Sequence, residues 1–401
     1  MTQAGSLPSV VVVGGSLGGL NAALALADLG CEVRVLERSA SALQARGAGI
    51  VALDETLRWF TGRPGVDPES LCSFTSWVRF LDPSGGVVHE REHRNRFSSW
   101  NTIYRAMLDA FAALAPGRYA LGSEVVSVAP DGDGAVVTEA SGTTTRADLV
   151  VAADGIASPT RAALLPDVAP RYAGYVAWRG TVPESELPDK VFAELRDAIT
   201  YQVLPDSHVL VYPIPGPSGS VVEGERLMNF VWYRNVAPGH EFDDVMTGVD
   251  GQVRPVSLPP GAMRPEHVDA LRGDARRLLA PVVADAVEAV AEPFVQAVFD
   301  IEVPRMAFGR VCLAGDAAFA VRPHAGAGTA KAAADGWELA AQLCAHPGDV
   351  EPALAAWQHN QLGVGRALLR RCREIGDSSQ VTGTFTPGDP ALSFGLRGPG
   401  T

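Results

Sequence analysis

The chain opens with a hydrophobic pattern that predicts a βαβ unit. Residues 10–13 are an unbroken run of valines that stops at glycines, as a buried parallel strand does. Residues 17–29 are rich in Ala and Leu and predict a helix, and the alternating residues 32–36 predict a second strand. A strand, a glycine turn, a helix and a strand in this order are typical of a parallel α/β sheet.

The middle of the chain combines polar stretches without a clear hydrophobic pattern and runs that alternate between hydrophobic and polar residues. Residues 80–101 show no clear period, and we expect loops there, including the charged run 89–94. Residues 106–114 predict a helix, and from about 172 to 300 long alternating runs predict an antiparallel sheet with one face over a ligand site. Short strands separated by Gly and Asp turns are expected at 125–129, 135–139, 143–146 and 149–153.

The last third of the chain returns to the pattern of its beginning. Residues 310–314 predict another buried strand, followed by glycines and by helices at 329–344 and 352–375. We therefore predict an α/β fold in which a mainly antiparallel sheet is inserted into a Rossmann-like domain, with helices at the C-terminus. The Rossmann-like domain comprises 1–75, 100–171 and 300–345, the inserted sheet domain 76–99 and 172–299, and the C-terminal helix and tail 346–401.

Composition and charge narrow the function classes. At 401 residues the chain is too long for one ordinary core, and 47% apolar with 20% charged residues is typical of a globular protein. The formal net charge of −13 argues against nucleic-acid and anionic-membrane partners. The N-terminal apolar run is too short for a signal core or a membrane span, so we expect a cytoplasmic protein. We expect reduced thiols and no metal, because metal-type spacing is absent among Cys31, Cys72, Cys312, Cys344 and Cys372.

The first chemical motif is the glycine turn after the first strand. Gly14 permits the tight turn, Gly19 permits close packing of the helix, and the helix N-terminus favours a pyrophosphate. Ser16 stands where the G-x-G-x-x-G pattern has its second glycine, which is a departure. Glu37 follows Gly19 by 18 residues, at the end of the second strand, where a carboxylate binds ribose hydroxyls. The spacing favours an adenosine-containing cofactor.

Three later motifs follow strands or enter a helix. Asp154-Gly155 and Gly315-Asp316 each end a predicted buried strand, where the ligands of such sheets lie. Residues 323–328 (Pro-His-Ala-Gly-Ala-Gly) enter an Ala-rich helix, and their small side chains let a flat ring system approach the backbone. The dipole of that helix would stabilise negative charge on the ring.

Together these motifs resemble the class A flavoprotein monooxygenases, the family of 4-hydroxybenzoate hydroxylase. That family combines an N-terminal FAD fingerprint, a central D-G, a later G-D and P-x-x-G-x-G, and all four stand here in order between positions 10 and 340. Fragments such as AGYVAWRG, VYPIPG, RPHAGAGTAKAAAD and FTPGDPALSFGL are similar to one branch, the 2,6-dihydroxypyridine 3-monooxygenases. A departure is Phe319, where the wider family often has His.

The resemblance implies an activity and a cofactor. The branch uses FAD, O2 and NADH, with NADPH as the alternative donor, to convert 2,6-dihydroxypyridine to 2,3,6-trihydroxypyridine through a flavin 4a-hydroperoxide. We also expect a homodimer without nucleic-acid or membrane partners. The implied FAD-binding residues are Gly14, Ser16, Leu17, Gly19, Glu37, Arg38, Arg105, Asp154, Asp316, Gly326, Ala327 and Gly328.

Candidate substrate residues come from the alternating strands and from the loop before the Ala-rich helix. Alternate positions of a strand share one face, and a hydroxylated ring needs an apolar slot with a few donors and acceptors. Trp178 and Arg179 point opposite ways on one strand, and we expect one of them to line the site. The other candidates are His208, Tyr212, Asn229, Pro323 through its carbonyl, and His324.

Several alternatives share part of this evidence. A hydroxylase of another phenolic or heteroaromatic ring would carry the same motifs, and a flavin oxidase or dehydrogenase would share the FAD fingerprint. A flavin halogenase would normally carry W-x-W-x-I-P, a signature that is absent from the chain. A nonenzymatic adenine-nucleotide sensor predicts no redox turnover, and a glycine loop shaped for a flat ring argues against it.

Overall fold

The N-terminal valines form the centre of a six-stranded sheet in the order β17-β18-β10-β1-β2-β6. The computed structural model describes residues 7–43, 48–63 and 65–401. All neighbouring strands of this sheet are parallel except β17, which is antiparallel to β18. The strands are β1 (Ser9–Val13), β2 (Glu32–Glu37), β6 (Tyr119–Leu121), β10 (Leu149–Ala152), β17 (Ala307–Phe308) and β18 (Val311–Leu313).

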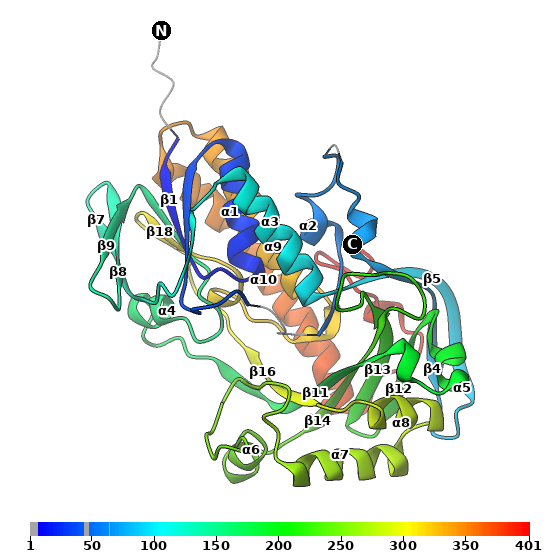
Figure 1. The fold of residues 1–401 in the computed structure, drawn as a ribbon. Helices are drawn as coiled ribbons and strands as arrows, with labels where there is room; N and C mark the ends of the chain where they lie inside the picture. Colours follow the sequence, from blue (N-terminus) through cyan, green and yellow to red (C-terminus); the bar gives the residue numbers. More distant parts are fainter. Residues whose placement is uncertain (1–6, 44–47, 64) are drawn as a thin grey trace.

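Long helices pack beside this sheet in the upper lobe of Figure 1. Helices α3 (Trp100–Leu114) and α9 (Gly328–Ala345) both contact α1 (Leu17–Leu29). Helix α10 (Val350–Gln380) packs on α9 and continues to strands of the second sheet, so it spans both lobes (Figure 1). The predicted Rossmann-like fold is confirmed.

The second lobe is built on a nine-stranded, mostly antiparallel sheet in the order β15-β16-β11-β14-β13-β12-β4-β5-β3. Only β12 and β4 run parallel among its named pairs. The strands are β3 (Gly49–Val51), β4 (Ser73–Leu81), β5 (Val87–Ser99), β11 (Arg171–Pro183), β12 (Ala198–Leu204), β13 (Ser207–Ile214), β14 (Leu227–Asn235), β15 (Ser257–Leu258) and β16 (Phe294–Asp300).

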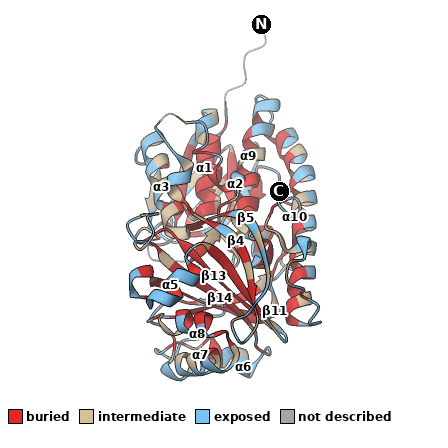
Figure 2. Ribbon diagram, turned by 90° about the vertical axis from the view of Figure 1, so that its right-hand side faces the viewer, coloured by how far each residue is buried: buried red, intermediate tan, exposed pale blue. Residues whose placement is uncertain are grey.

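Alternation along the central strands separates two faces of this sheet. Trp178, Phe230 and Trp232 pack with the outer helices, which cover one face (Figure 2). Tyr212 and Tyr233 belong to the opposite face, which packs with the end of α10 and the tail. The helices in the outer layer are α5 (Asp189–Leu195), α6 (His240–Val245), α7 (Pro265–Leu278) and α8 (Pro281–Glu288).

Shorter elements complete the fold. A three-stranded sheet, β7-β8-β9, lies beside the first sheet (Figure 1). Its strands and the remaining helices are β7 (Val125–Asp131), β8 (Gly134–Glu139), β9 (Thr144–Ala147), α2 (Asp54–Leu57), α4 (Pro159–Leu164), and the 3₁₀ turns η1 (Pro68–Leu71), η2 (Glu184–Glu186), η3 (Gly315–Ala317), η4 (Pro323–Ala325) and η5 (Pro390–Leu392).

Two expectations about the second lobe were wrong. Residues 80–101 are not loops: β4 ends at Leu81, and the charged run 89–94 lies inside β5. Its charges hide the strand period because much of β5 is exposed to solvent. The region 172–300 also contains four α-helices and one 3₁₀ turn that the sequence pattern did not predict.

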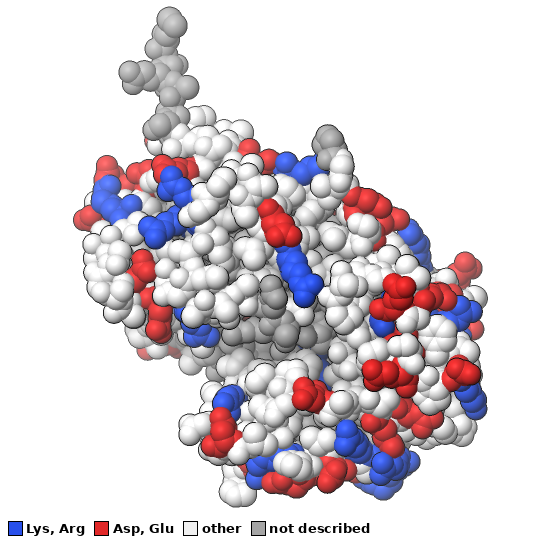
Figure 3. Space-filling model, viewed as in Figure 1, with Lys and Arg blue, Asp and Glu red and all other residues white. Residues whose placement is uncertain are grey.

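Two kinds of feature, membrane-spanning helices and clusters of metal-ligating side chains, are absent from the described residues. Within 7–43, 48–63 and 65–401, no helix combines the length and apolarity needed to cross a membrane. No cluster of three or more metal-ligating side chains occurs in the same ranges. Residues 1–6, which precede the first strand, lie outside the described residues. Acidic and basic side chains are interspersed over the face in Figure 3.

Candidate functional site

Three turns lie side by side at the carboxyl edge of the first sheet. Val13 pairs with Ala152, and Ala152 pairs with Leu313, so β1, β10 and β18 end together. Each strand leads directly into one of the glycine or aspartate motifs. The open edge of a parallel sheet is where ligands bind in such folds.

Close backbone contacts fix the first turn. Gly14 has φ +98°, and a Cβ there would stand 2.4 Å from the carbonyl oxygen of Ala153. A Cβ at Gly19 would be 1.8 Å from the Gly14 oxygen, so both glycines are sterically required. The Glu37 carboxylate accepts from the backbone N–H of Gly15 (2.8 Å) and of Ser39 (2.9 Å). Glu37 therefore fixes the turn in addition to facing the cleft.

Two helix N-termini point into the cleft without a side-chain cap. Helix α1 follows Ser16, whose hydroxyl makes no capping bond to a described residue. Helix α9 follows Ala327, which has no capping group. Uncapped N–H groups and the positive end of the dipole attract anionic ligand groups.

Arg161 connects the second and third turns. Its guanidinium donates to the carbonyl oxygens of Ile156 (2.6 Å) and Ala317 (3.2 Å). Burial lowers the pKa of Arg161, and the negative charges of Asp154 and Asp316 oppose that shift. One Asp154 oxygen accepts from Thr160 N–H, while the other is buried without a partner among the described residues. The second turn thus keeps a free acceptor.

The third turn is held from behind by a buried ion pair on α9. Lys331 and Asp335 are 1% and 0% exposed, and their Nζ and Oδ2 atoms are 2.6 Å apart. The same Asp335 oxygen accepts from the N–H of Gly315 (2.8 Å). Phe319 completes this arrangement, because its ring centre lies 4.9 Å from the Lys331 ammonium.

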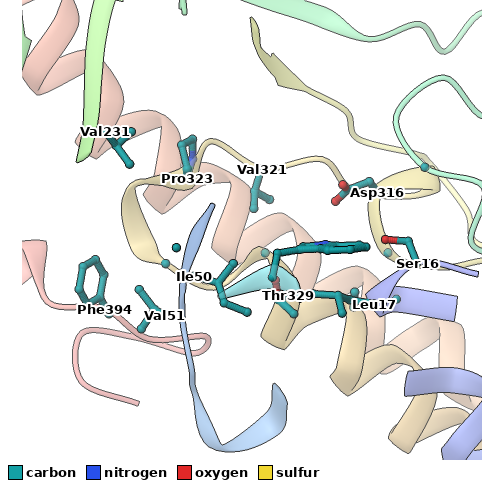
Figure 4. Close-up of a pocket in the computed structure, with 18 of the residues that line it drawn as sticks. Ser16, Leu17, Ile50, Val51, Val231, Asp316, Val321, Pro323, Thr329 and Phe394 are labelled. Atoms are coloured by element: carbon teal, nitrogen blue, oxygen red, sulfur yellow. The ribbon is translucent and has the colours of Figure 1, made fainter. Parts of the chain in front are cut away.

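Asp316 is the acidic side chain of the third turn, and it faces the cavity (Figure 4). Solvent reaches the side chain through the cleft, but the surrounding protein raises its pKa. Lys331 and Arg161 oppose that rise, whereas the Asp335 carboxylate adds to it. The Asp316 carboxylate can therefore accept hydrogen bonds from a ligand in the cavity that it lines.

The cleft consists of two adjoining cavities, which share Ser16, Ile50, Trp100 and Arg179. The Glu37 cavity has about 480 Å³ and is lined by Gly14, Glu37, Arg38, Ser123, Asp154 and neighbouring residues. The Tyr212 cavity has about 360 Å³ and is lined by Leu17, Tyr212, Val231, Asp316, Pro323, Phe394 and neighbouring residues. Both volumes are in the range of small-molecule and cofactor sites.

The Tyr212 cavity is polar at one end and apolar at the other. Ser16 and Asp316 lie at the end next to the glycine turns (Figure 4). Val231, Val51 and Phe394 lie at the far end, where the second sheet closes the cavity (Figure 4). A flat ligand can therefore extend from the turns to an apolar slot.

Gly49 is clamped between side chains of the second sheet. Arg179 donates to its carbonyl oxygen (2.9 Å), and Asn229 Oδ1 accepts from its N–H (3.0 Å). A Cβ at Gly49 would be 2.6 Å from the Tyr212 ring, so only glycine fits. Burial raises the pKa of Tyr212, and Arg179 and Asn229 oppose the rise. The clamp places Ile50 against both cavities.

The two predicted histidines lie behind the Tyr212 cavity. His208 and His324 line a separate cavity of about 30 Å³. His324 Nε2 is 2.7 Å from the Tyr175 hydroxyl, and His208 stacks on Phe385 with ring centres 5.0 Å apart. Burial lowers the pKa of His208 to about 3 and that of His324 well below 6.5, so both are neutral.

Models of known protein families match three parts of the chain. Residues 9–54 match the pyridine nucleotide-disulphide oxidoreductase model, and residues 283–371 match the FAD binding domain model. Residues 172–300 match an FAD binding domain-like model. The first and third turns of the first lobe thus fall within the two models, whereas the Asp154-Gly155 turn lies outside the matched ranges.

Full-length relatives decide the family. A 2,6-dihydroxypyridine 3-monooxygenase of Paenarthrobacter nicotinovorans is 38% identical over 96% of this chain and 95% of that protein. The chain belongs to the class A FAD-dependent aromatic hydroxylases. The solved 2,6-dihydroxypyridine-3-hydroxylase from Arthrobacter nicotinovorans matches this hydroxylase at a TM-score of 0.92 and 36% identity, covering 99% of both chains. A 3-amino-4-hydroxybenzoate 2-monooxygenase of Streptomyces cremeus is 29% identical over 92% of this chain and 86% of that protein.

The residues of the cleft fit FAD. A pyrophosphate needs donors, which the uncapped start of α1 offers, and ribose or ribityl hydroxyls need acceptors such as Asp154, Asp316 and Glu37. The unpartnered Asp154 oxygen is one such acceptor. A Cβ at Gly14 would meet the Ala153 backbone at 2.4 Å, so the chain of the first turn passes close to that of the second. These groups would hold the adenosine end in the Glu37 cavity and the flavin in the Tyr212 cavity.

Most of the candidate residues of this hydroxylase meet in the cleft. Ala327 and Gly19 are exceptions that support the turns from behind. Arg105 is not among the residues that line either cavity: it is exposed on α3 and donates to the carbonyl of Pro217 (3.0 Å). The candidates that line the two cavities are Gly14, Ser16, Leu17, Glu37, Arg38, Asp154, Tyr212, Asp316, Pro323, Gly326 and Gly328.

Further residues near the cavities were left open or missed by the sequence analysis. Arg179 lines both cavities, and the alternating strand left a choice between it and Trp178. Trp178 packs in the outer core instead. Trp100 and Phe394 reach the Tyr212 cavity from distant parts of the chain, and no local sequence signal identifies them. Asn229 contributes through Gly49 rather than by lining the cavity.

Proposed function

We propose that this hydroxylase converts 2,6-dihydroxypyridine to 2,3,6-trihydroxypyridine. The likeness to 2,6-dihydroxypyridine 3-monooxygenase over nearly the whole chain supports this substrate. The observation that carries the proposal is the apolar end of the Tyr212 cavity at Val51, Val231 and Phe394, in the same cavity as the turn residues Ser16 and Asp316. Arg179 also lines this cavity. A single ring with two hydroxyls matches a slot of this kind.

The side chains of the slot have separate tasks. Leu210 and Val231 contact the faces and edge of the ring and keep water out. The Tyr212 hydroxyl and the carbonyl of Pro323 hydrogen-bond the substrate hydroxyls. Arg179 favours the deprotonated form of a hydroxyl beside it, because a nearby cation stabilises an anion. A deprotonated hydroxyl makes the ring more electron-rich at the carbon that is oxidised.

FAD, when bound, supplies the transfer of two electrons from the donor and the activation of O2. The overall reaction is ring–H, O2, NADH and H⁺ to ring–OH, NAD⁺ and water. We propose NADH rather than NADPH as the donor, as the resemblance implies. We further propose that the hydroxylase works in the cytoplasm as a homodimer.

The proposal predicts that 2,6-dihydroxypyridine stimulates NADH oxidation with little release of peroxide. Holoenzyme would be assayed for donor oxidation, peroxide and 2,3,6-trihydroxypyridine, with and without the ring and with NADH or NADPH. We expect one product molecule per NADH and a slower reaction with NADPH. Stimulation accompanied by one peroxide per NADH would contradict the substrate assignment, because the pyridine would then be only an effector.

A further inference from the structure

The C-terminal tail forms one wall of the Tyr212 cavity through Phe394. The ring of Phe394 lies beside Val51, at the end of the cavity farthest from Asp316 (Figure 4). It packs against the loop before α9, since a Cβ at Gly326 would be 2.8 Å from its Cδ1 atom. It also meets the Phe97 ring edge-on, with centres 6.3 Å apart.

Phe394 also separates the Tyr212 cavity from three neighbouring cavities. One of these, the His93 cavity, has about 390 Å³ and is lined by His93, Arg94, Asn95 and Arg96 on β5. Two smaller ones have about 30 Å³ each, and one of them contains His208 and His324. Phe394 lines all four cavities. Val51 is the other residue that lines both the Tyr212 cavity and the His93 cavity, so these two residues stand between them.

The backbone around Phe394 is fixed to the rest of the site. Arg371 of α10 donates to the carbonyl oxygens of Ser393 and Gly395, the latter at 2.9 Å. The N–H of Gly395 donates to the carbonyl of Ala325, in the loop before α9, at 3.0 Å. These bonds fix the backbone on both sides of the Phe394 ring. A side chain held in this way can set the length of a cavity.

We propose that Phe394 determines the size of ring that this hydroxylase accepts. Its side chain ends the slot after one ring, and it keeps the water of the His93 cavity away from the reacting carbon. Without the ring, the slot and the His93 cavity become continuous. The inference rests on the proposed function only in that the Tyr212 cavity holds the aromatic substrate.

The test compares ligand binding by holoenzyme variants, so it does not depend on turnover. Dissociation constants would be measured from the change in flavin absorbance for 2,6-dihydroxypyridine and for the two-ring 2,4-dihydroxyquinoline. We expect Phe394→Ala to bind the two-ring ligand more tightly relative to 2,6-dihydroxypyridine, so that the ratio of the two dissociation constants changes by roughly tenfold or more in favour of the two-ring ligand. We expect Phe394→Trp to shift it in the opposite direction, and Phe394→Ala to release more peroxide per NADH.

Phe385→Ala is the matched control, because Phe385 lies on the same tail but lines only the cavity that contains His208. This variant removes the same ring from another position, and we expect its ratio of the two dissociation constants to equal that of wild type. Phe394→Leu keeps an apolar side chain and gives an intermediate ratio should the alanine variant lose FAD. An unchanged ratio in the Phe394 variants, or an equal shift in Phe385→Ala, overturns the inference. Should 2,6-dihydroxypyridine fail to bind wild type, the proposed substrate fails, and the ratio is measured with salicylate as the one-ring ligand.

Discussion

Replacing Lys331 by Met is expected to lower the free energy of unfolding by about 3–5 kcal/mol. The ammonium is 1% exposed, and it neutralises the fully buried Asp335 carboxylate. Met has a similar length but no charge, so the substitution leaves an uncompensated anion behind the third turn. Urea unfolding of the holoenzyme, followed by circular dichroism, measures the loss.

The double variant Lys331→Met with Asp335→Asn separates charge from packing. Asn can still accept from the N–H of Gly315, as Asp335 does now at 2.8 Å. We therefore expect the double variant to recover most of the stability lost in Lys331→Met. A single variant as stable as wild type, or a double variant less stable than the single, would show that the buried pair does not have this role.

Replacing Asp316 by Ala is expected to weaken FAD binding about tenfold to a hundredfold. The carboxylate faces the cavity, where it is placed to accept from a hydroxyl of the cofactor (Figure 4). A hydrogen bond to a charged group contributes about 1.5–3 kcal/mol, which corresponds to that range of dissociation constants. Fluorescence titration of the apoprotein with FAD measures the change.

Two further variants make the Asp316 result specific. Asp316→Asn keeps an acceptor oxygen and is expected to bind FAD with an affinity between those of wild type and Asp316→Ala. Asp269→Ala removes an exposed carboxylate from α7 and is expected to bind as wild type does. Full FAD occupancy and wild-type affinity in Asp316→Ala would be incompatible with the assigned role.

The first lobe was predictable because its signals are local. The valines of β1, the glycines of the turn and Glu37 are close in sequence, and each has a steric or charge requirement that other residue types do not meet. Asp154 and Asp316 could be placed because they end buried parallel strands, whose carboxyl ends share one edge. The family resemblance added the FAD assignment to these positions.

The second lobe was less predictable because its signals depend on tertiary contacts. Strand β5 carries charges on an exposed surface, so its period was obscured. His208 and His324 lie on the expected strand and loop, but their direction into a small rear cavity depends on α10 and the tail. Phe394 follows a Gly/Pro-rich segment, and tertiary bonds of its neighbours hold it at the site: Arg371 donates to the Gly395 carbonyl, and the Gly395 N–H donates to the Ala325 carbonyl.

The most direct test of the central claim is the fate of oxygen atoms from isotopically labelled O2. Holoenzyme would be supplied with NADH, 2,6-dihydroxypyridine and oxygen-18 gas in unlabelled water, and the product analysed by mass spectrometry. We predict one labelled oxygen atom in each molecule of trihydroxypyridine, since in the proposed reaction the new ring oxygen comes from O2 and not from water. A product whose new oxygen comes from water, or an unchanged ring with labelled peroxide, would contradict the account.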